Sequence, residues 1–144
     1  MEIERAGRTA ARLARLVEVA LGQVELSLSQ YRILMLLDRH AAVASKLAHH
    51  LAVSPPSVTA VVDGLVARGL VERRAQEGDR RRVEHALTGD GRRLLGEADA
   101  RIDARFGEIA SFLEASEAAE AAAGLQRWGE ALDAYRSSRL EVKA

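Results

Sequence analysis

The spacing of hydrophobic positions predicts that most of this chain is helical. Apolar residues recur every three or four positions from Ile3 to Val24, which indicates one long amphipathic helix. The same spacing predicts a long helix that begins at Thr88 and a final helix that is capped by Ser116. Their apolar positions are Leu95, Ala98, Ile102, Phe106, Ile109 and Leu113 in the first, and Ala121, Leu125, Trp128, Leu132 and Tyr135 in the second.

Shorter elements are expected between these helices. Ser27 and Gln30 have the spacing of a capping box, in which the hydroxyl accepts from a later amide and the glutamine returns to the cap. We therefore expect a helix to begin here and to end near residues 38–40. A short edge strand over residues 41–43 and a brief helix over residues 45–51 follow.

The next segment carries start and stop signals for a helix over residues 55–68. Ser54 is placed as its N-cap and Pro55 as its first residue, where the missing N–H of proline would have no partner anyway. Gly69 is placed to end the helix as the residue after the C-cap. Two short helices joined by a tight turn form a helix-turn-helix.

A β-hairpin is expected after this helix. Residues 70–74 and 82–87 alternate in the manner of strands around a polar tip over residues 75–81. A helix-turn-helix followed by such a hairpin is a winged helix. The predicted fold class is therefore mainly α with a small β-hairpin wing, in which a winged helix-turn-helix is flanked by long helices.

Composition indicates an ordinary globular protein. The chain has 144 residues, about one domain, of which 48% are hydrophobic and 29% charged. It has no cysteine, which excludes disulfides, thiolate catalysis and cysteine-bound zinc. The charged residues near Met1 and the lack of a long apolar run argue against a signal peptide and a membrane span. We therefore expect a cytoplasmic protein with no membrane partner.

Positive charge is concentrated in the middle of the chain, although the formal net charge is zero. Residues 68–82 hold six arginines and three acidic residues. This concentration suits double-stranded DNA as a partner. The helix over residues 55–68 can enter the major groove by its N-terminal end, while the hairpin tip reaches the adjacent minor groove or backbone.

The outward face of the helix over residues 55–68 consists of small residues. At about 100° per residue, the inward positions are Val58, Val61, Val62 and Leu65. The outward positions are Pro56, Ser57, Thr59, Ala60, Asp63, Gly64 and Ala67. This face can approach DNA closely, but it holds no Arg, Asn or Gln for bidentate contact with a base.

Residues 26–95 resemble the MarR family of winged-helix transcriptional regulators. The resemblance rests on the segments LSLSQYRIL, SKLAHHLAVSPPSVTAVVDGLVARGLVERR and DRRRVEHALTGDG. The last segment fits the family pattern at Asp79, Arg81, Leu87, Thr88 and Gly91. The outer helices are similar to the dimerisation region of the family in length and order.

The resemblance implies a homodimeric repressor that binds a pseudo-palindromic operator. It places the helix over residues 55–68 in the major groove and a wing over residues 75–82 in the minor groove. Arg81 would insert there, oriented by Asp79, while hydroxyl residues of the helix meet the backbone and base edges. The candidate DNA-binding residues are Ser54, Pro55, Ser57, Thr59, Ala60, Arg68, Arg73, Arg74, Asp79, Arg80, Arg81 and Arg82.

The resemblance also implies a single domain over residues 1–144. Its DNA-binding lobe would cover residues 26–90, and dimerisation helices would cover residues 1–25 and 91–144. A pocket between these parts would take a small aromatic or anionic effector that releases the DNA. The polar candidates for this pocket are Arg12, Tyr31, Arg32 and His40, each of which fits a surface or core-edge role equally well.

Two departures from the family pattern bear on sequence recognition. Ala60 or Gly64 stands where family members often carry a long basic residue, and Val43 or Ala44 replaces the usual hydroxyl cap of the brief helix. Base-specific affinity is therefore expected to depend on the wing and on DNA shape. The alternative function is a winged helix kept for protein interaction or architecture, without specific operator readout.

Sequence signatures of other chemistry are missing. The chain has no G-x-S-x-G or H-E-x-x-H motif. His49 and His50 are adjacent, so one helix face does not offer both to a metal. Leu94 stands at the third glycine position of a phosphate loop begun at Gly89. We expect no enzymatic activity, no cofactor and no metal site.

Overall fold

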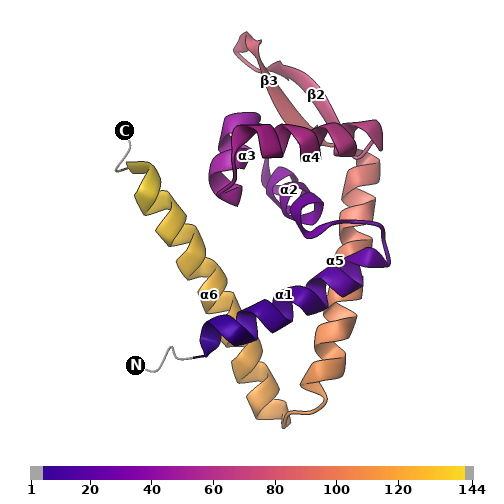
Figure 1. Cartoon of the computed structure of the whole chain (residues 1–144), viewed down its shortest axis with the longest axis vertical. Coiled ribbons are helices and arrows are strands. Elements are labelled where there is room, and N and C mark those ends of the chain that lie inside the picture. Colours follow the sequence, from indigo (N-terminus) through magenta and orange to yellow (C-terminus); the bar gives the residue numbers. More distant parts are fainter. Residues whose placement is uncertain (1–4, 142–144) are drawn as a thin grey trace. The chain divides into compact units, whose positions relative to one another are not determined.

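The structure is a computed structural model that describes residues 5–141 and is largely helical (Figure 1). The elements in this range are α1 (Ala6–Gly22), α2 (Leu28–Arg39), β1 (Ala42–Val43), α3 (Ala44–Leu51), α4 (Pro55–Ala67), β2 (Val71–Gln76), β3 (Asp79–Leu87), α5 (Gly89–Ala110) and α6 (Ala115–Glu141). The predicted fold class, mainly α with a small hairpin wing, is confirmed.

The chain divides into two compact units, one up to Arg105 and one from Phe106 onward. The first unit holds α1 to α4, the sheet and most of α5, and the second holds the end of α5 and α6. The proposed limits of the DNA-binding lobe, residues 26–90, stay a prediction.

The connection between α1 and α2 confirms one expectation and corrects another. α1 ends at Gly22, a poor helix former, so Val24 lies in the turn that follows rather than on the helix. Ile3, the predicted start of this stripe, lies outside the described residues. The capping box is confirmed, because Ser27 Oγ accepts from the Gln30 amide at 3.1 Å and Gln30 Oε1 accepts from the Ser27 amide at 2.9 Å.

The core of the first unit draws side chains from most of its elements. The large side chains that are fully buried are Leu21, Ile33, Leu34, Leu47, Val58, Val62, Leu65 and Val71. Burying one such side chain stabilises a fold by roughly 1.5–3 kcal/mol relative to exposing it. Because α2, α3, α4 and β2 all contribute, the core fixes α4 and the sheet relative to each other.

The end of α4 confirms the predicted stop signal. Gly69 adopts a φ of 72°, a conformation that glycine reaches without steric cost. Its amide bonds to the Val66 carbonyl at 2.9 Å, and the Leu70 amide bonds to the Leu65 carbonyl at 3.0 Å. These are the two bonds of a Schellman motif, with Arg68 as the C-cap one residue beyond the helix.

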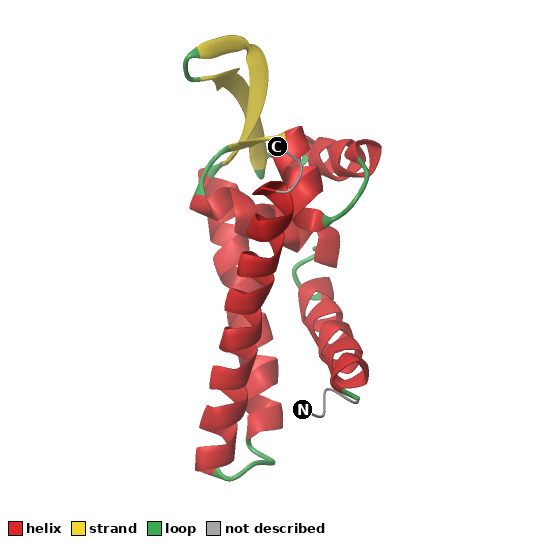
Figure 2. Cartoon of the chain, turned by 90° about the vertical axis from the view of Figure 1, so that its left-hand side faces the viewer, coloured by secondary structure: helices red, strands yellow, loops and turns green. Residues whose placement is uncertain are grey.

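The wing belongs to a three-stranded antiparallel sheet with the order β1-β3-β2, drawn in yellow in Figure 2. The predicted edge strand is confirmed as β1, in which Ala42 pairs with His85. Val43 then serves as the N-cap of α3 without a side-chain hydrogen bond. The missing hydroxyl cap expected from the sequence is therefore confirmed.

The hairpin is longer than the alternating pattern predicts. β2 reaches Gln76 and β3 begins at Asp79. The tip is therefore the two-residue turn formed by Glu77 and Gly78, and the predicted polar loop over residues 75–81 is wrong. Gly78 has a φ of 84°, which suits a tight hairpin turn.

The register of the hairpin explains why the alternation of polar and apolar residues predicted strands that are too short. Ala75 pairs with Val83, but the next residue of β2, Gln76, pairs with Asp79. The arginines at 80–82 therefore form a bulge on β3, where the strand has more residues than its partner. A run of identical polar residues cannot alternate, so the sequence pattern gives no sign of the strand there.

α5 begins against the segment that follows α4. Thr88 Oγ1 accepts from the Gly91 amide at 3.0 Å and donates to the Gly69 carbonyl at 2.7 Å. A Cβ atom at Gly91 would lie 2.1 Å from the Leu70 carbonyl oxygen, so this position needs glycine. The predicted helix start is confirmed, with Thr88 as the capping side chain.

The predicted cap of the last helix is wrong. α6 begins at Ala115, so Ser116 lies inside its first turn. The carboxylate of Glu117 accepts from the Glu114 amide at 3.0 Å instead. A negative side chain at this end also interacts favourably with the helix dipole.

Candidate nucleic-acid interface

The outward face of α4 is small and carries one charge. Its exposed residues are Pro56, Ser57, Thr59, Ala60, Asp63 and Ala67. Gly64, which the helical wheel places outward, is half-buried, and a Cβ atom there would meet Gln30 Nε2 of α2 at 3.9 Å. Gly64 therefore faces α2, because the neighbouring helix covers that edge of the outward face.

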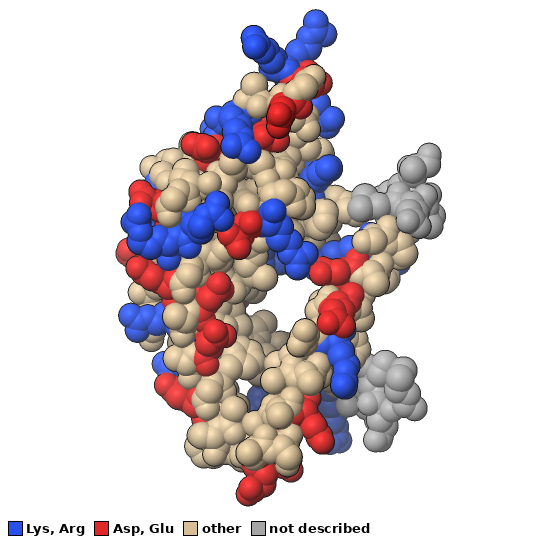
Figure 3. Space-filling model, turned by 180° about the vertical axis from the view of Figure 1, so that it is seen from behind, with Lys and Arg blue, Asp and Glu red and all other residues tan. Residues whose placement is uncertain are grey.

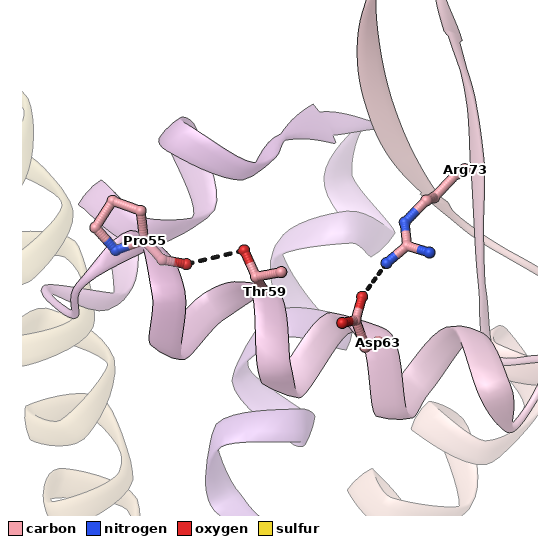
Figure 4. A network of polar contacts seen from close by, with 4 residues as sticks. All are labelled: Pro55, Thr59, Asp63 and Arg73. Carbon is pink, nitrogen blue, oxygen red and sulfur yellow. Dashed lines mark hydrogen bonds and ion pairs between the residues drawn. The ribbon is translucent and has the colours of Figure 1, made fainter.

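Hydroxyl groups gather at the N-terminal end of α4. Ser54 occupies the N-cap position, but its side chain accepts no amide hydrogen bond. Its Oγ lies 2.8 Å from Ser57 Oγ, and the two hydroxyls share a hydrogen bond. Thr59 Oγ1 donates to the Pro55 carbonyl at 3.1 Å, as Figure 4 shows. These contacts fix the hydroxyls at the end of the helix that is expected to enter a groove.

The bulge of β3, next to the turn of the wing, presents three arginines that have no side-chain partner among the described residues. Arg80, Arg81 and Arg82 are exposed, and their side chains make no hydrogen bond or ion pair within residues 5–141. Asp79 Oδ1 accepts from the backbone amide of Arg81 at 3.0 Å, which shapes the bulge that presents it. Figure 3 shows basic side chains projecting at this end of the molecule.

The other three candidate arginines have partners inside the first unit. Arg68 Nη1 donates to the Glu25 carbonyl at 2.7 Å. Arg74 Nε pairs with Glu84 Oε1 across the hairpin at 2.8 Å. Arg73 pairs with Asp63 of α4, and Figure 4 shows it leaving β2 toward that carboxylate. The sequence analysis predicted the same DNA-binding role for all six arginines. In the structure, the three arginines of the β3 bulge are exposed without side-chain partners among the described residues, whereas the other three are held by contacts within the first unit.

A groove lies between α4 and the wing, and a buried histidine is one of its lining residues. It is lined by Ala44, Thr59, Val62, Arg73, Val83 and His85. The ring Nδ1 of His85 lies 3.3 Å from the Ala42 carbonyl. Burial lowers the pKa of His85, and the nearby Arg73 lowers this pKa further against the opposing effect of the Ala42 hydrogen bond. The sequence analysis missed this residue, whose signal is its place beside Ala86 and Leu87 at the buried end of β3.

Two of the four effector candidates contact other elements. Tyr31 donates its hydroxyl to Asp99 Oδ1 of α5 at 2.7 Å. Burial raises the pKa of Tyr31, and this hydrogen bond raises it further. Arg32 Nη2 donates to the Leu51 carbonyl at 3.3 Å, and Arg32 lines a small hollow with Ser57 between α2 and α4.

The other two effector candidates lie elsewhere. Arg12 is exposed on α1, and His40 is exposed just after α2. The structure therefore does not gather the four side chains around one hollow. Their role in binding an effector stays a prediction.

Within the part of the chain that the structure describes, no group of three or more His, Cys, Asp or Glu residues could hold a metal ion. His50 Nδ1 lies 3.0 Å from the Lys46 carbonyl, and its ring meets that of His49 edge-on. None of the helices within residues 5–141 is long and apolar enough to cross a membrane.

Comparison with known sequences relates this interface to one family. Residues 26–83 match the sequence profile of the MarR family. Over 94 residues the chain is 32% identical to the HTH-type transcriptional regulator FarR of Neisseria gonorrhoeae. That match spans 65% of this chain and 64% of the relative, so less than two thirds of the relative is covered.

Comparison with solved structures extends the likeness over most of the chain. CouR from Rhodococcus jostii RHA1, solved with p-coumaroyl-CoA bound, is 30% identical, with a TM-score of 0.67 over 83% of this chain and 85% of that one. Mycobacterium tuberculosis Rv2887, solved in complex with p-aminosalicylic acid, is 27% identical, with a TM-score of 0.71 over 86% and 95%. Apo MarR from E. coli is 24% identical, with a TM-score of 0.74 over 88% and 98%, and supports the fold alone.

Proposed function

Because this chain belongs to the MarR family of transcription regulators, we propose that it is a homodimeric repressor that binds a pseudo-palindromic DNA operator. The observation that carries this proposal is the combination of two surfaces on one compact unit. α4 offers a face of small and hydroxyl residues, and the wing tip offers three arginines that have no partner within residues 5–141.

The proposed role of α4 is to enter the major groove by its N-terminal end. Ser57, Thr59 and Ala60 are exposed there and are short enough to let the helix backbone come close to the bases. Hydroxyls can donate to or accept from base edges, and methyl groups can contact thymine. Amides at a helix N-terminus also favour phosphate oxygens.

The proposed role of the wing is to anchor the protein in the minor groove. Arg81 would insert there, where narrow A·T-rich segments concentrate negative potential. Arg80 and Arg82 flank it in the bulge and would meet the phosphates on either side. Asp79 supports this presentation through its contact with the Arg81 amide.

A homodimer is proposed because the second unit exposes large apolar side chains. These are Ile109, Phe112, Leu113, Leu125, Trp128, Leu132 and Tyr135, with Phe112 89% exposed. Monomeric proteins rarely expose so many large apolar side chains close together, and an exposed apolar surface of this kind marks a protein–protein interface. A second copy would cover them and would place two α4 helices on one face of the DNA.

An aromatic anion is proposed as the effector that releases the DNA. CouR and Rv2887 were solved with p-coumaroyl-CoA and p-aminosalicylic acid, both of which combine an aromatic ring with negative charge. In this chain Arg32 lines a hollow next to α4, whereas the Tyr31 hydroxyl contacts Asp99 of α5. A ligand there would act directly on the position of α4.

Selection from a random pool of DNA duplexes tests the proposed function. Wild-type protein is expected to enrich inverted repeats, because a two-fold dimer presents two equivalent recognition helices. Salt-dependent binding to all duplexes without enrichment would instead favour the architectural alternative, for which the lack of Arg, Asn and Gln on the outward face of α4 is the supporting observation.

Three variants separate the wing from α4 in this test. Arg81→Ala is expected to cost about 1–3 kcal/mol of binding to the selected duplex and to flatten the salt dependence by roughly one counterion per wing. Thr59→Ala should have a smaller salt effect, because the threonine hydroxyl is uncharged and displaces no counterion. Arg101→Ala removes the same charge from an exposed position on α5 and should bind as wild type. Wild-type affinity and salt slope in Arg81→Ala would exclude the wing as the anchor.

A further inference from the structure

The groove between α4 and the wing contains an ion pair that the proposed function does not use. Asp63 is the one charged residue of α4 and lies on its outward face, one turn after Thr59 (Figure 4). Arg73 Nη2 pairs with Asp63 Oδ1 from the side of β2. The pair therefore connects the element expected in the major groove with the element expected to reach the minor groove.

Each partner alone would change DNA binding without carrying sequence information. An unpaired carboxylate on this face would repel phosphates, and an unpaired guanidinium would attract the phosphates of any duplex. When paired, the two groups carry no net charge. The side chains of Asp63 and Arg73 are 57% and 43% exposed, so phosphates could reach Arg73 once its partner is removed.

The neighbouring arginines are arranged differently. Arg74 pairs with Glu84 within the hairpin, and Arg68 donates to the backbone carbonyl of Glu25. Neither of these contacts involves the outward face of α4. Of the six candidate arginines, Arg73 is thus the one that a carboxylate of the proposed recognition helix holds in place.

We propose that Asp63 is a specificity-determining residue that holds Arg73 in the groove between α4 and the wing. This inference rests on the proposed DNA-binding function. The pair keeps Arg73 away from the phosphates of non-operator DNA, so non-specific binding lacks one cation per protomer. It also links β2 to α4, which keeps Arg81 and Thr59 at the spacing that one operator half-site requires.

The test compares Asp63→Asn with wild type on the duplex enriched from the random pool and on its scrambled version, over a salt series. For Asp63→Asn, binding to the scrambled duplex should tighten about three- to tenfold, and the slope of log K against log salt should steepen by about 0.9 per protomer. Binding to the selected duplex should tighten less, because that complex loses the fixed spacing. The ratio of the two affinities should therefore fall.

Two further variants control this comparison. Asp63→Glu keeps the carboxylate and should retain the wild-type ratio. Asp38→Asn removes a carboxylate of comparable exposure that pairs with Arg92 between α2 and α5 at 2.8 Å. Because that pair lies on other elements, Asp38→Asn should leave both the ratio and the salt slope unchanged.

Several outcomes would overturn the inference. A wild-type ratio and slope in Asp63→Asn contradict it, as does equal weakening on both duplexes, which would assign Asp63 to the stability of the fold alone. If Asp63→Asn does not fold, Arg73→Gln breaks the same link and should lower the ratio without steepening the slope. An unchanged ratio in Arg73→Gln then contradicts the inference. Wild-type protein that binds both duplexes equally would contradict the proposed function itself.

Discussion

The imidazole of His85 is the most protected ionisable group at the base of the wing. Its side chain is 6% exposed, and its Nδ1 lies 3.3 Å from the Ala42 carbonyl. Burial lowers its pKa below the ordinary value, and Arg73 adds to that shift. The folded protein therefore holds this ring neutral at a pH at which the unfolded chain already takes up a proton.

This lowered pKa predicts a pH-dependent stability. The contribution of His85 is complete above its unfolded pKa of about 6.5, and it is lost as the pH falls toward the folded value. Urea unfolding at fixed protein concentration should give a free energy of unfolding that falls below about pH 6.5, by at most about 1.4 kcal/mol per pH unit from this group. His85→Gln should remove that part of the slope. Parallel pH curves for the two proteins would contradict the assignment.

Local sequence signals predicted residue roles well where both partners lie close in the chain. The capping box at Ser27 and the stop at Gly69 are confirmed, because each depends on backbone geometry within a few residues. The Asp63–Arg73 pair could not be predicted in the same way. It exists only because the Schellman turn brings β2 back alongside α4. Gly64 was misplaced because α2, a distant part of the chain, covers that edge of α4.

At the scale of elements, the junction between α4, the wing and α5 depends on one close approach. A Cβ atom at Gly91 would lie 2.1 Å from the Leu70 carbonyl oxygen and 2.8 Å from Leu87 Cδ1. Backbone is the nearest neighbour, so the start of α5 must shift to admit a methyl group. Such a shift would move the wing, because β3 runs directly into this helix.

Two glycine substitutions in α5 test this junction. Gly91→Ala should lower the free energy of unfolding by about 1–3 kcal/mol, the usual cost of overpacking. Gly96→Ala is the matched control, since a Cβ there would meet no atom of the described residues within 4 Å apart from its chain neighbours and the backbone of its own helix. It should stabilise the helix by roughly 0.5–1 kcal/mol, because glycine is unfavourable in a helix interior. Equal unfolding midpoints for the two variants in urea would contradict the close contact.

The helices and strands could be predicted from sequence where their apolar residues recur at helical spacing or alternate with polar residues. The six helices of the described residues follow the spacing of their apolar positions, and errors at their ends are one to three residues. The largest error is Leu113, which was predicted on the helix from Thr88 but lies three residues beyond the end of α5 at Ala110. The predicted bounds of the wing tip were wrong because a bulge interrupts strand pairing where three arginines follow one another. The start of α6 was wrong because Glu117, rather than a hydroxyl, satisfies the amide at that end.

At the scale of the whole molecule, the apolar face of α6 predicts association. Trp128 is 56% and Leu132 is 48% exposed in the single chain. Trp128→Asp should convert the proposed dimer into monomer or abolish folding, because a charge would be buried in the interface. Gln126→Asp introduces the same charge about 200° away around the helix and should remain dimeric. Light scattering at micromolar concentration measures both, and a monomeric wild type would contradict the prediction.

A two-fold dimer also constrains the DNA that it can recognise. Its two recognition helices must meet the same side of the duplex, so the half-site centres should lie about one helical turn, roughly 10 bp, apart. An insertion of about five base pairs between the half-sites rotates one of them to the opposite side. This insertion should abolish tight binding, and the same insertion placed outside the half-sites should have no effect. With one half-site turned away, contacts to the phosphate backbone alone would sustain only the weaker, salt-dependent binding. Titration of the three duplexes decides the matter, and unchanged affinity for the duplex with the internal insertion would contradict simultaneous binding of both half-sites.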